Sequence, residues 1–89
     1  MAIEVSPQLD KKLKNIRLKN KKLFVKIEKQ LLLFQKDQNH PSLRIHKLKG
    51  DLKNVWSISI ARSFRMIYTQ ENDVAYFFDI GKHEEVYRK

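Results

Sequence analysis

Val55-Trp56-Ser57-Ile58-Ser59-Ile60 alternates strictly between apolar side chains and small polar ones. A period of two residues places Trp56, Ile58 and Ile60 on one face of a β-strand and the two serines on the other. Phe64-Arg65-Met66-Ile67-Tyr68-Thr69 alternates in the same way after three intervening residues. The two runs therefore predict a β-hairpin with one apolar face and one polar face.

The register of this hairpin follows from the turn that joins its strands. A turn made of the three intervening residues pairs Ile60 with Phe64 and Ser59 with Arg65. Ser57 then points, like Ser59 and Arg65, away from the apolar face. We expect helices to cover the apolar face, which is lined by Trp56, Ile58, Ile60, Phe64, Met66 and Tyr68.

Upstream of the hairpin, apolar residues recur at the spacing of an α-helix in two successive segments of the chain. Ser6-Pro7 is typical of a helix start, because a hydroxyl caps the first amides and proline fits the first helical position. Asn20 marks the turn into a second helix, which ends before Asn39-His40-Pro41 because the residue preceding proline disfavours helical backbone. The predicted apolar stripes are Leu9, Leu13 and Ile16 on the first helix and Phe24, Ile27, Leu31 and Phe34 on the second.

Two further strands complete the predicted fold. Met1–Val5 is predicted to be a short edge strand. Val74–Ile80 has apolar residues at both odd and even positions, as a central strand with two buried faces does. The turn Gln70-Glu71-Asn72-Asp73 precedes the central strand. The sequence thus predicts an α+β fold, in which an N-terminal helical hairpin packs on one face of a small antiparallel sheet. Residues 1–89 are expected to form a single domain, since a chain this short does not divide its core.

The net charge of +9 restricts the possible partners. Such a chain attracts polyanions, chiefly nucleic acid, an anionic membrane or an acidic protein. The sequence has no cysteine, which excludes disulfides and thiolate metal sites and is typical of the reducing cytoplasm. No apolar run approaches the ~20 residues of a transmembrane helix, so no membrane partner is expected. Three scattered histidines do not form a ligand pattern, so neither a metal nor another cofactor is expected.

Groups able to move protons and bind phosphate gather in the second half of the chain. Asp79-Ile80-Gly81-Lys82-His83-Glu84-Glu85-Val86-Tyr87 reads as a buried strand that breaks at its glycine and then presents a histidine and a tyrosine four residues apart. His46, in the run His46-Lys47-Leu48-Lys49-Gly50, adds a second proton-transfer group, and Arg65 adds a phosphate-binding cation. In a small basic domain, this combination is typical of an RNA-cleaving site.

Each of these residues also has a purely structural interpretation. Arg65 can pair with Asp79 across the sheet, Tyr87 can cap the core, and the histidines can lie on the surface. The lysine-rich helices are most simply solvated faces, although they also suit ribosomal RNA. The residues alone leave these alternatives open.

The order and spacing of the motifs resemble the RelE/ParE superfamily of type II toxins, and in particular its RelE/StbE-like branch. The resemblance spans essentially the whole chain. The blocks that carry it are His40-Pro41-Ser42-Leu43-Arg44, His46-Lys47-Leu48-Lys49-Gly50, Val55-Trp56-Ser57, Phe64-Arg65-Met66-Ile67-Tyr68 and Asp79-Ile80-Gly81-Lys82-His83-Glu84-Glu85-Val86-Tyr87-Arg88.

The resemblance implies a cytoplasmic toxin with mRNA interferase activity, that is, a ribosome-dependent endoribonuclease that blocks translation and is inhibited by a cognate antitoxin. It implies that Arg65 steadies the scissile phosphate and that Tyr87 stacks on, or assists at, the cut nucleotide. His83 takes the place of an arginine in RelE and of a histidine in the YafQ-like toxins, and His46 matches another histidine of the latter. We expect these two histidines to transfer protons. Further contacts with mRNA on the ribosome are expected from Lys47, Lys49, Ser59, Arg62, Lys82 and Arg88.

The chain departs from the family pattern at Ser57 and Ser59. RelE has two lysines on this strand and the YafQ-like toxins have another histidine there, whereas serine neither acts as a base nor carries charge at neutral pH. Two alternatives follow from other classes: a ParE-like toxin that acts on DNA gyrase by protein binding, and a non-catalytic homologue retained as an antitoxin-binding module. The ParE-like branch lacks a catalytic constellation, which this chain keeps in Arg65, His83 and Tyr87.

Overall fold

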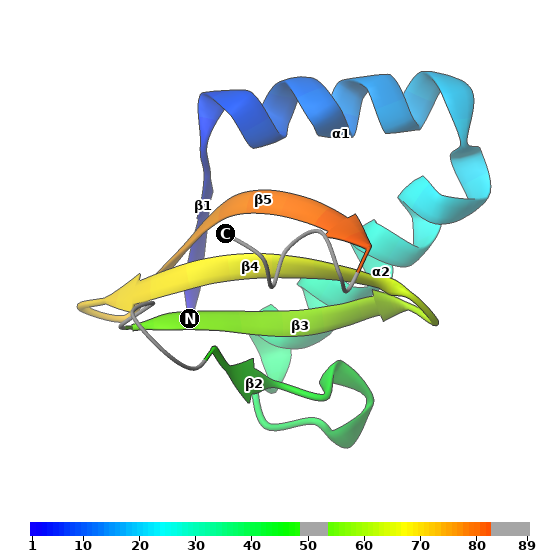
Figure 1. The fold of residues 1–89 in the computed structure, drawn as a ribbon. Coiled ribbons are helices and arrows are strands. Elements are labelled where there is room, and N and C mark those ends of the chain that lie inside the picture. Colours follow the sequence, from blue (N-terminus) through cyan, green and yellow to red (C-terminus); the bar gives the residue numbers. More distant parts are fainter. Residues whose placement is uncertain (49–53, 83–89) are drawn as a thin grey trace.

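The computed structural model describes residues 1–48 and 54–82, in which two helices pack on one face of a five-stranded sheet (Figure 1). The predicted α+β class, with its N-terminal helical hairpin, is confirmed. Along the chain, the elements are β1 (Ala2–Val5), α1 (Pro7–Lys19), α2 (Lys21–Lys36), the short 3-10 helix η1 (Pro41–Leu43), β2 (His46–Lys47), β3 (Val55–Ala61), β4 (Phe64–Glu71) and β5 (Val74–Lys82).

The strands lie in the order β1-β5-β4-β3-β2. β1 runs parallel to β5, and the other neighbouring strands are antiparallel. The sheet is therefore mixed, and the prediction of an antiparallel sheet is wrong for its first strand. The parallel pairing is possible because the whole helical hairpin and three strands separate β1 from β5 in sequence, far more than a parallel crossover needs. The predicted edge position of the first strand and the central position of the last one are both confirmed.

Both helices begin where the sequence predicts. Ser6 Oγ accepts a hydrogen bond from the Leu9 amide at 3.1 Å, and Asn20 Oδ1 accepts one from the Leu23 amide at 3.1 Å. These contacts satisfy amides that have no partner within the helix. α2 ends at Lys36, ahead of the proline, as expected. No helix within the described ranges is long and apolar enough to cross a lipid bilayer.

The main hydrophobic core lies between the helices and the sheet, with α1 packed on β5 and α2 on β3. Phe34, from α2, is 1% exposed and meets Tyr68 and Phe77 edge-on, with ring centroids 5.2 and 5.5 Å apart. Edge-to-face packing of this kind is favoured by the quadrupoles of the rings. Burial raises the pKa of Tyr68 to about 12, so its hydroxyl stays neutral throughout the physiological range.

The β3–β4 hairpin has the predicted faces but a different turn. Ser59 pairs with Arg65, as predicted, whereas Ala61 and not Ile60 pairs with Phe64. The predicted pairing of Ile60 with Phe64 is therefore wrong. The chain closes the hairpin with two turn residues instead of three, and the register shift between Ser59 and Ala61 takes up the extra residue. Ile60 remains 5% exposed, in the core.

The β4–β5 connection is also tighter than the sequence suggests. β4 continues through Glu71, and the turn consists of Asn72 and Asp73, both with positive φ (48° and 63°). Asn and Asp tolerate this left-handed backbone, which suits a two-residue hairpin. The prediction that β5 breaks at Gly81 is wrong. Because Gly81 pairs with Arg65 across the ladder, the strand runs on to Lys82.

Phe34→Ala should lower the free energy of unfolding by about 3–5 kcal/mol, because it removes a ring on which two other aromatic side chains pack. Urea denaturation followed by circular dichroism measures this change. Leu32→Ala is the matched control, since Leu32 lies on the same helix but is 59% exposed, and it should change stability by less than about 0.5 kcal/mol. Equal losses in the two variants would contradict this description of the core.

Candidate active site

Arg65 lies near the start of β4, on the sheet face opposite the helices, and only 8% of it is exposed. Its Nε donates a hydrogen bond to Ser57 Oγ at 2.9 Å. Its Nη2 donates to the Arg44 carbonyl oxygen and, at 3.4 Å, to the Ser57 carbonyl oxygen. The guanidinium therefore ties β4 to β3 and to the segment before β2. The predicted face is right, but Arg65 is buried and held there, where the sequence predicts an open surface.

Ser57, on β3, is fully buried and lies between Arg65 and the β2 strand. Its Cα is the ladder partner of His46, and opposite residues of an antiparallel pair project from the same face. His46 itself is exposed. The fold thus places an exposed histidine, a buried serine and a buried arginine on one face of the sheet.

Arg44 adopts a left-handed backbone conformation, with φ 44° and ψ 54°. This conformation ends η1, where the Arg44 amide donates to the Pro41 carbonyl at 3.1 Å. For a residue with a β-carbon, such a backbone costs about 1 kcal/mol or more. The Arg44 carbonyl in turn accepts from the Arg65 guanidinium, and a hydrogen bond from a charged donor offsets a cost of this size.

A second, smaller apolar cluster shares the face with Arg65. It consists of Leu48, Val55 and Ile67, with Phe78 packed against it. These side chains lower the local dielectric constant, so the charge on Arg65 acts more strongly than it would in water. The face that the sequence predicts to be open and polar is therefore apolar in part.

A groove of about 560 Å³ runs between α2, η1 and the β3–β4 turn. Gln30, on α2, forms part of its wall and donates hydrogen bonds to the carbonyl oxygens of Ser59 and Ser42. The described residues that line the groove include four cations and no carboxylate. The cations are Lys26, Lys29, Arg44 and Arg62. Ser59, the ladder partner of Arg65, joins this basic groove to the Arg65 region.

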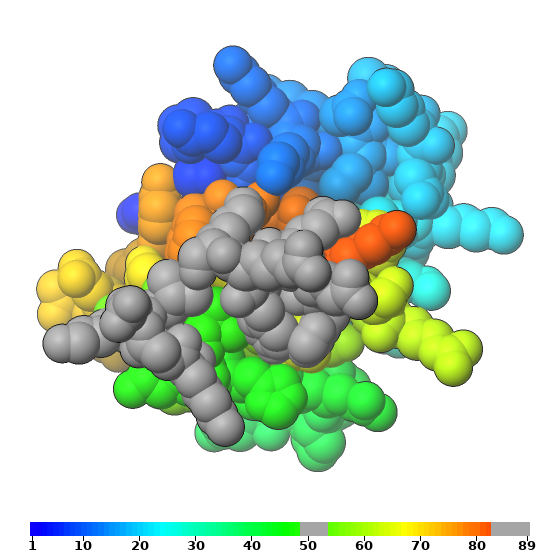
Figure 2. All heavy atoms as spheres, viewed as in Figure 1, coloured from blue at the N-terminus to red at the C-terminus, as the bar shows by residue number. Residues whose placement is uncertain are grey.

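The other described residues with a predicted RNA contact lie apart from Arg65. Lys47 Nζ is 5.7 Å from the centroid of the Trp56 ring, and it shares a face with that ring. Lys82 is exposed at the end of β5, opposite Phe64. Both partners, Trp56 and Phe64, pack against the main core, so these two lysines belong to the helix side of the sheet. Figure 2 shows β2 (green) at the edge of the molecule far from α1 (blue).

Four predicted site residues lie outside the described residues: Lys49, His83, Tyr87 and Arg88. The described part of β5 brings the chain to Lys82, one residue beyond the pairing of Gly81 with Arg65. The positions of His83 and Tyr87 in the site therefore remain sequence predictions.

Asp79, which the sequence offers as a structural partner for Arg65, accepts a hydrogen bond from Lys12 Nζ at 2.6 Å. The Asp79 side chain is 6% exposed, whereas that of Lys12 is 51% exposed. This ion pair links α1 to β5. The sequence does not predict this ion pair, because Lys12 is one of many similar lysines on the first helix.

Comparison with known proteins places the chain in a family. A family model described as the bacterial toxin of a type II toxin–antitoxin system, YafQ, matches residues 1–88. No curated protein sequence matches the chain.

Solved structures share the fold. YafQ from E. coli strain BL21(DE3) has a TM-score of 0.76 at 18% sequence identity, with 96% of each chain covered. A chain of the E. coli DinJ–YafQ complex gives 0.76 at 20% identity, again with 96% of each chain covered. A chain of the YoeB–YefM complex from Staphylococcus aureus gives 0.77 at 25% identity and covers 93% of this chain and 97% of that one. The chain therefore belongs to the YafQ family of bacterial toxins of type II toxin–antitoxin systems, a family of endoribonucleases.

Proposed function

We propose that the chain is a ribosome-dependent mRNA endoribonuclease that needs no metal and acts in the cytoplasm. The observation that best supports this proposal is the arrangement around Ser57, which bonds Arg65 and is the ladder partner of His46. A fixed cation next to an exposed imidazole suits phosphoryl transfer, because the reaction develops negative charge at phosphorus and moves two protons.

In the proposed reaction, the RNA 2′-hydroxyl attacks the adjacent phosphorus. One of His46 and His83 takes the proton of the 2′-hydroxyl, and the other gives a proton to the 5′-oxygen as its bond to phosphorus breaks. Arg65 stabilises the charge on the phosphoryl oxygens in the transition state. Tyr87 holds the base by stacking. The products are a 2′,3′-cyclic phosphate and a 5′-hydroxyl end.

Ser57 takes a different role from the basic residues that RelE and the YafQ-like toxins carry on this strand. A buried hydroxyl does not serve as a base, but it accepts a hydrogen bond from Arg65 Nε and so fixes the plane of the guanidinium. We assign Ser57 as a positioning residue that acts through Arg65. In this role, serine on the strand is compatible with catalysis and does not mark a lost active site.

The basic groove provides a path for the RNA backbone. Its four cations face no carboxylate among the described lining residues, and Ser59 connects it to Arg65. Lys47, Lys49, Lys82 and Arg88 would add phosphate contacts outside the groove. Binding through phosphate contacts releases counterions, so affinity for RNA and ribosomes should fall steeply with salt.

We infer that a cognate antitoxin, encoded beside this gene, holds the toxin inactive. The similar solved structures include toxin–antitoxin complexes of two kinds, DinJ–YafQ and YoeB–YefM. The charge of +9 suits an acidic partner.

Expression of the chain without a partner should stop translation and create new mRNA ends inside coding regions. Primer extension or ribosome profiling detects such ends, and chemical analysis should find 2′,3′-cyclic phosphate on the upstream fragments. Intact mRNA combined with inhibition of DNA gyrase would instead support the ParE-like alternative. Intact mRNA and unaffected gyrase would leave the chain as a non-catalytic homologue.

Arg65→Ala should reduce single-turnover cleavage on programmed ribosomes by about 10²–10³-fold, because its contact strengthens in the transition state. His46→Ala should cost about 10²–10⁴-fold if the imidazole transfers a proton. Arg17→Ala, at an exposed position on α1, is the matched control and should cleave close to the wild-type rate. Circular dichroism checks that each variant is folded. Wild-type rates in folded Arg65→Ala and His46→Ala would rule out this site.

A further inference from the structure

Gln30 occupies a position of α2 at which an apolar side chain is expected. Ile27 precedes it by three residues and Phe34 follows it by four, so the three side chains project from one side of the helix. Like those two core residues, Gln30 is buried, with 8% of it exposed. A buried amide costs free energy unless it is hydrogen-bonded, so packing alone does not account for a glutamine here.

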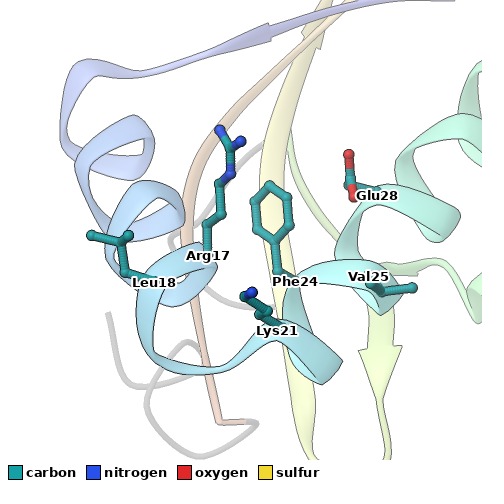
Figure 3. Close-up of a pocket in the computed structure, with 6 residues that line it drawn as sticks. All are labelled: Arg17, Leu18, Lys21, Phe24, Val25 and Glu28. Atoms are coloured by element: carbon teal, nitrogen blue, oxygen red, sulfur yellow. The ribbon is translucent and has the colours of Figure 1, made fainter.

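The exposed side of α2 carries different residues. Figure 3 shows the junction of α1 and α2, where Val25 and Glu28 lie on that exposed side and line a depression. Gln30 lines another hollow, the basic groove between α2, η1 and the β3–β4 turn. Its amide therefore reaches the part of the chain that leads to Arg65.

The amide nitrogen of Gln30 links two backbone segments. It donates a hydrogen bond to the Ser59 carbonyl oxygen at 2.9 Å and another to the Ser42 carbonyl oxygen at 3.3 Å. Ser59 stands at the register shift of the β3–β4 hairpin, where the ladder is interrupted. Ser42 lies in η1, and the last carbonyls of a helix find no donor within it. Both contacts thus lie where regular backbone pairing stops, and together they use both protons of the amide.

The link made by Gln30 runs parallel to the link made by Arg65. Arg65 bonds to Ser57 on β3 and to the carbonyl oxygen of Arg44, directly after η1. Gln30 bonds to the same two segments, in each case two residues away along the chain. The two side chains approach from opposite faces of the sheet, because α2 covers the core face and Arg65 lies on the other. Each link therefore holds together the segments that the other one joins.

We propose that Gln30 is a positioning residue for Arg65. Its amide fixes β3 against the end of η1, and so sets the separation of Ser57 and the Arg44 carbonyl, the two groups that hold the guanidinium. The Ser42 contact lies two residues before Arg44, whose left-handed backbone is the strained part of this arrangement. The inference rests on the proposed function only for its effect on cleavage, since the mobility of Arg65 can be measured without RNA.

The direct test is Gln30→Met, which removes both donors and keeps a side chain of similar length. Nuclear magnetic resonance of the full ¹⁵N-labelled chain follows hydrogen exchange of the Arg65 Nε–H, which is buried and bonded to Ser57. Its exchange rate should rise by about tenfold or more, because the acceptors of the guanidinium are no longer held at a fixed separation. Exchange of the Phe77 amide, in the core of β5, reports opening of the whole sheet and should rise less.

Gln35→Met is the matched control, since it makes the same change at an exposed position of α2, and it should leave Arg65 exchange unchanged. Gln30→Glu keeps the shape of the side chain but lacks the amide protons, and it should give the same local rise if Gln30→Met does not fold. An unchanged Arg65 exchange rate in a folded Gln30 variant would overturn the proposal. So would an equal rise at Arg65 and Phe77, because it would show a loss of global stability and no specific effect on the guanidinium.

Cleavage on programmed ribosomes gives a second readout. Gln30→Met should lower the saturating single-turnover rate by about tenfold through misplacement of Arg65. The ribosome concentration at half-saturation should stay within about twofold, because the amide acts on Arg65 and not on RNA binding. A change in half-saturation alone would make Gln30 an RNA-binding residue of the basic groove and would contradict a positioning role. If the wild-type chain cleaves no RNA, the nuclease proposal fails, whereas the exchange experiment still decides the role of Gln30.

Discussion

The buried guanidinium of Arg65 is the interaction on which the organisation of the candidate site depends. A buried charged group is costly unless hydrogen bonds satisfy it, and Arg65 bonds to Ser57 and to the Arg44 carbonyl. These contacts join two adjacent strands and the segment leading into β2. They also account for the left-handed backbone of Arg44, a local strain that the charge-assisted hydrogen bond offsets. The position of His46 follows, because β2 begins two residues later.

The two sides of the sheet carry different surfaces. On one side, α1 and α2 bury the main core and leave an apolar groove with a basic rim facing outward. On the far face of the sheet, Arg65 and Ser57 lie beside a small apolar cluster. A basic groove opens between α2, η1 and the β3–β4 turn.

Much of the fold could be predicted because the sequence carries strong local signals. The alternation around Trp56 gives the strands and their faces, and Ser6 and Asn20 give the helix starts. The turn between β3 and β4 could not be predicted in detail, because a two-residue turn with a bulge and a three-residue turn suit the same alternating pattern. The parallel pairing of β1 depends on contacts distant in sequence, for which the residues of a short edge strand hold no signal.

The sequence points to the titratable side chains of the candidate site. It does not reveal the groups that hold those side chains in position. Residue type and family resemblance point to Arg65 and His46. The family pattern marks Ser57 only as a departure, although the predicted pairing of Ser59 with Arg65 places Ser57 on the same face as the guanidinium. The Arg44 carbonyl is a backbone atom that any residue supplies, so its role depends on local conformation and leaves no mark in the sequence.

The most direct measurement is a double-mutant cycle on the single-turnover cleavage rate with Ser57→Ala and Arg65→Ala. If Ser57 acts by holding Arg65, Ser57→Ala alone should slow cleavage by about 10–100-fold through misplacement of the guanidinium. In the Arg65→Ala background, the same substitution should change the rate by less than about twofold, because nothing remains for the hydroxyl to position. Ser57→Thr, which keeps the hydroxyl, should retain most of the wild-type rate. Equal slowing by Ser57→Ala in both backgrounds would contradict the account.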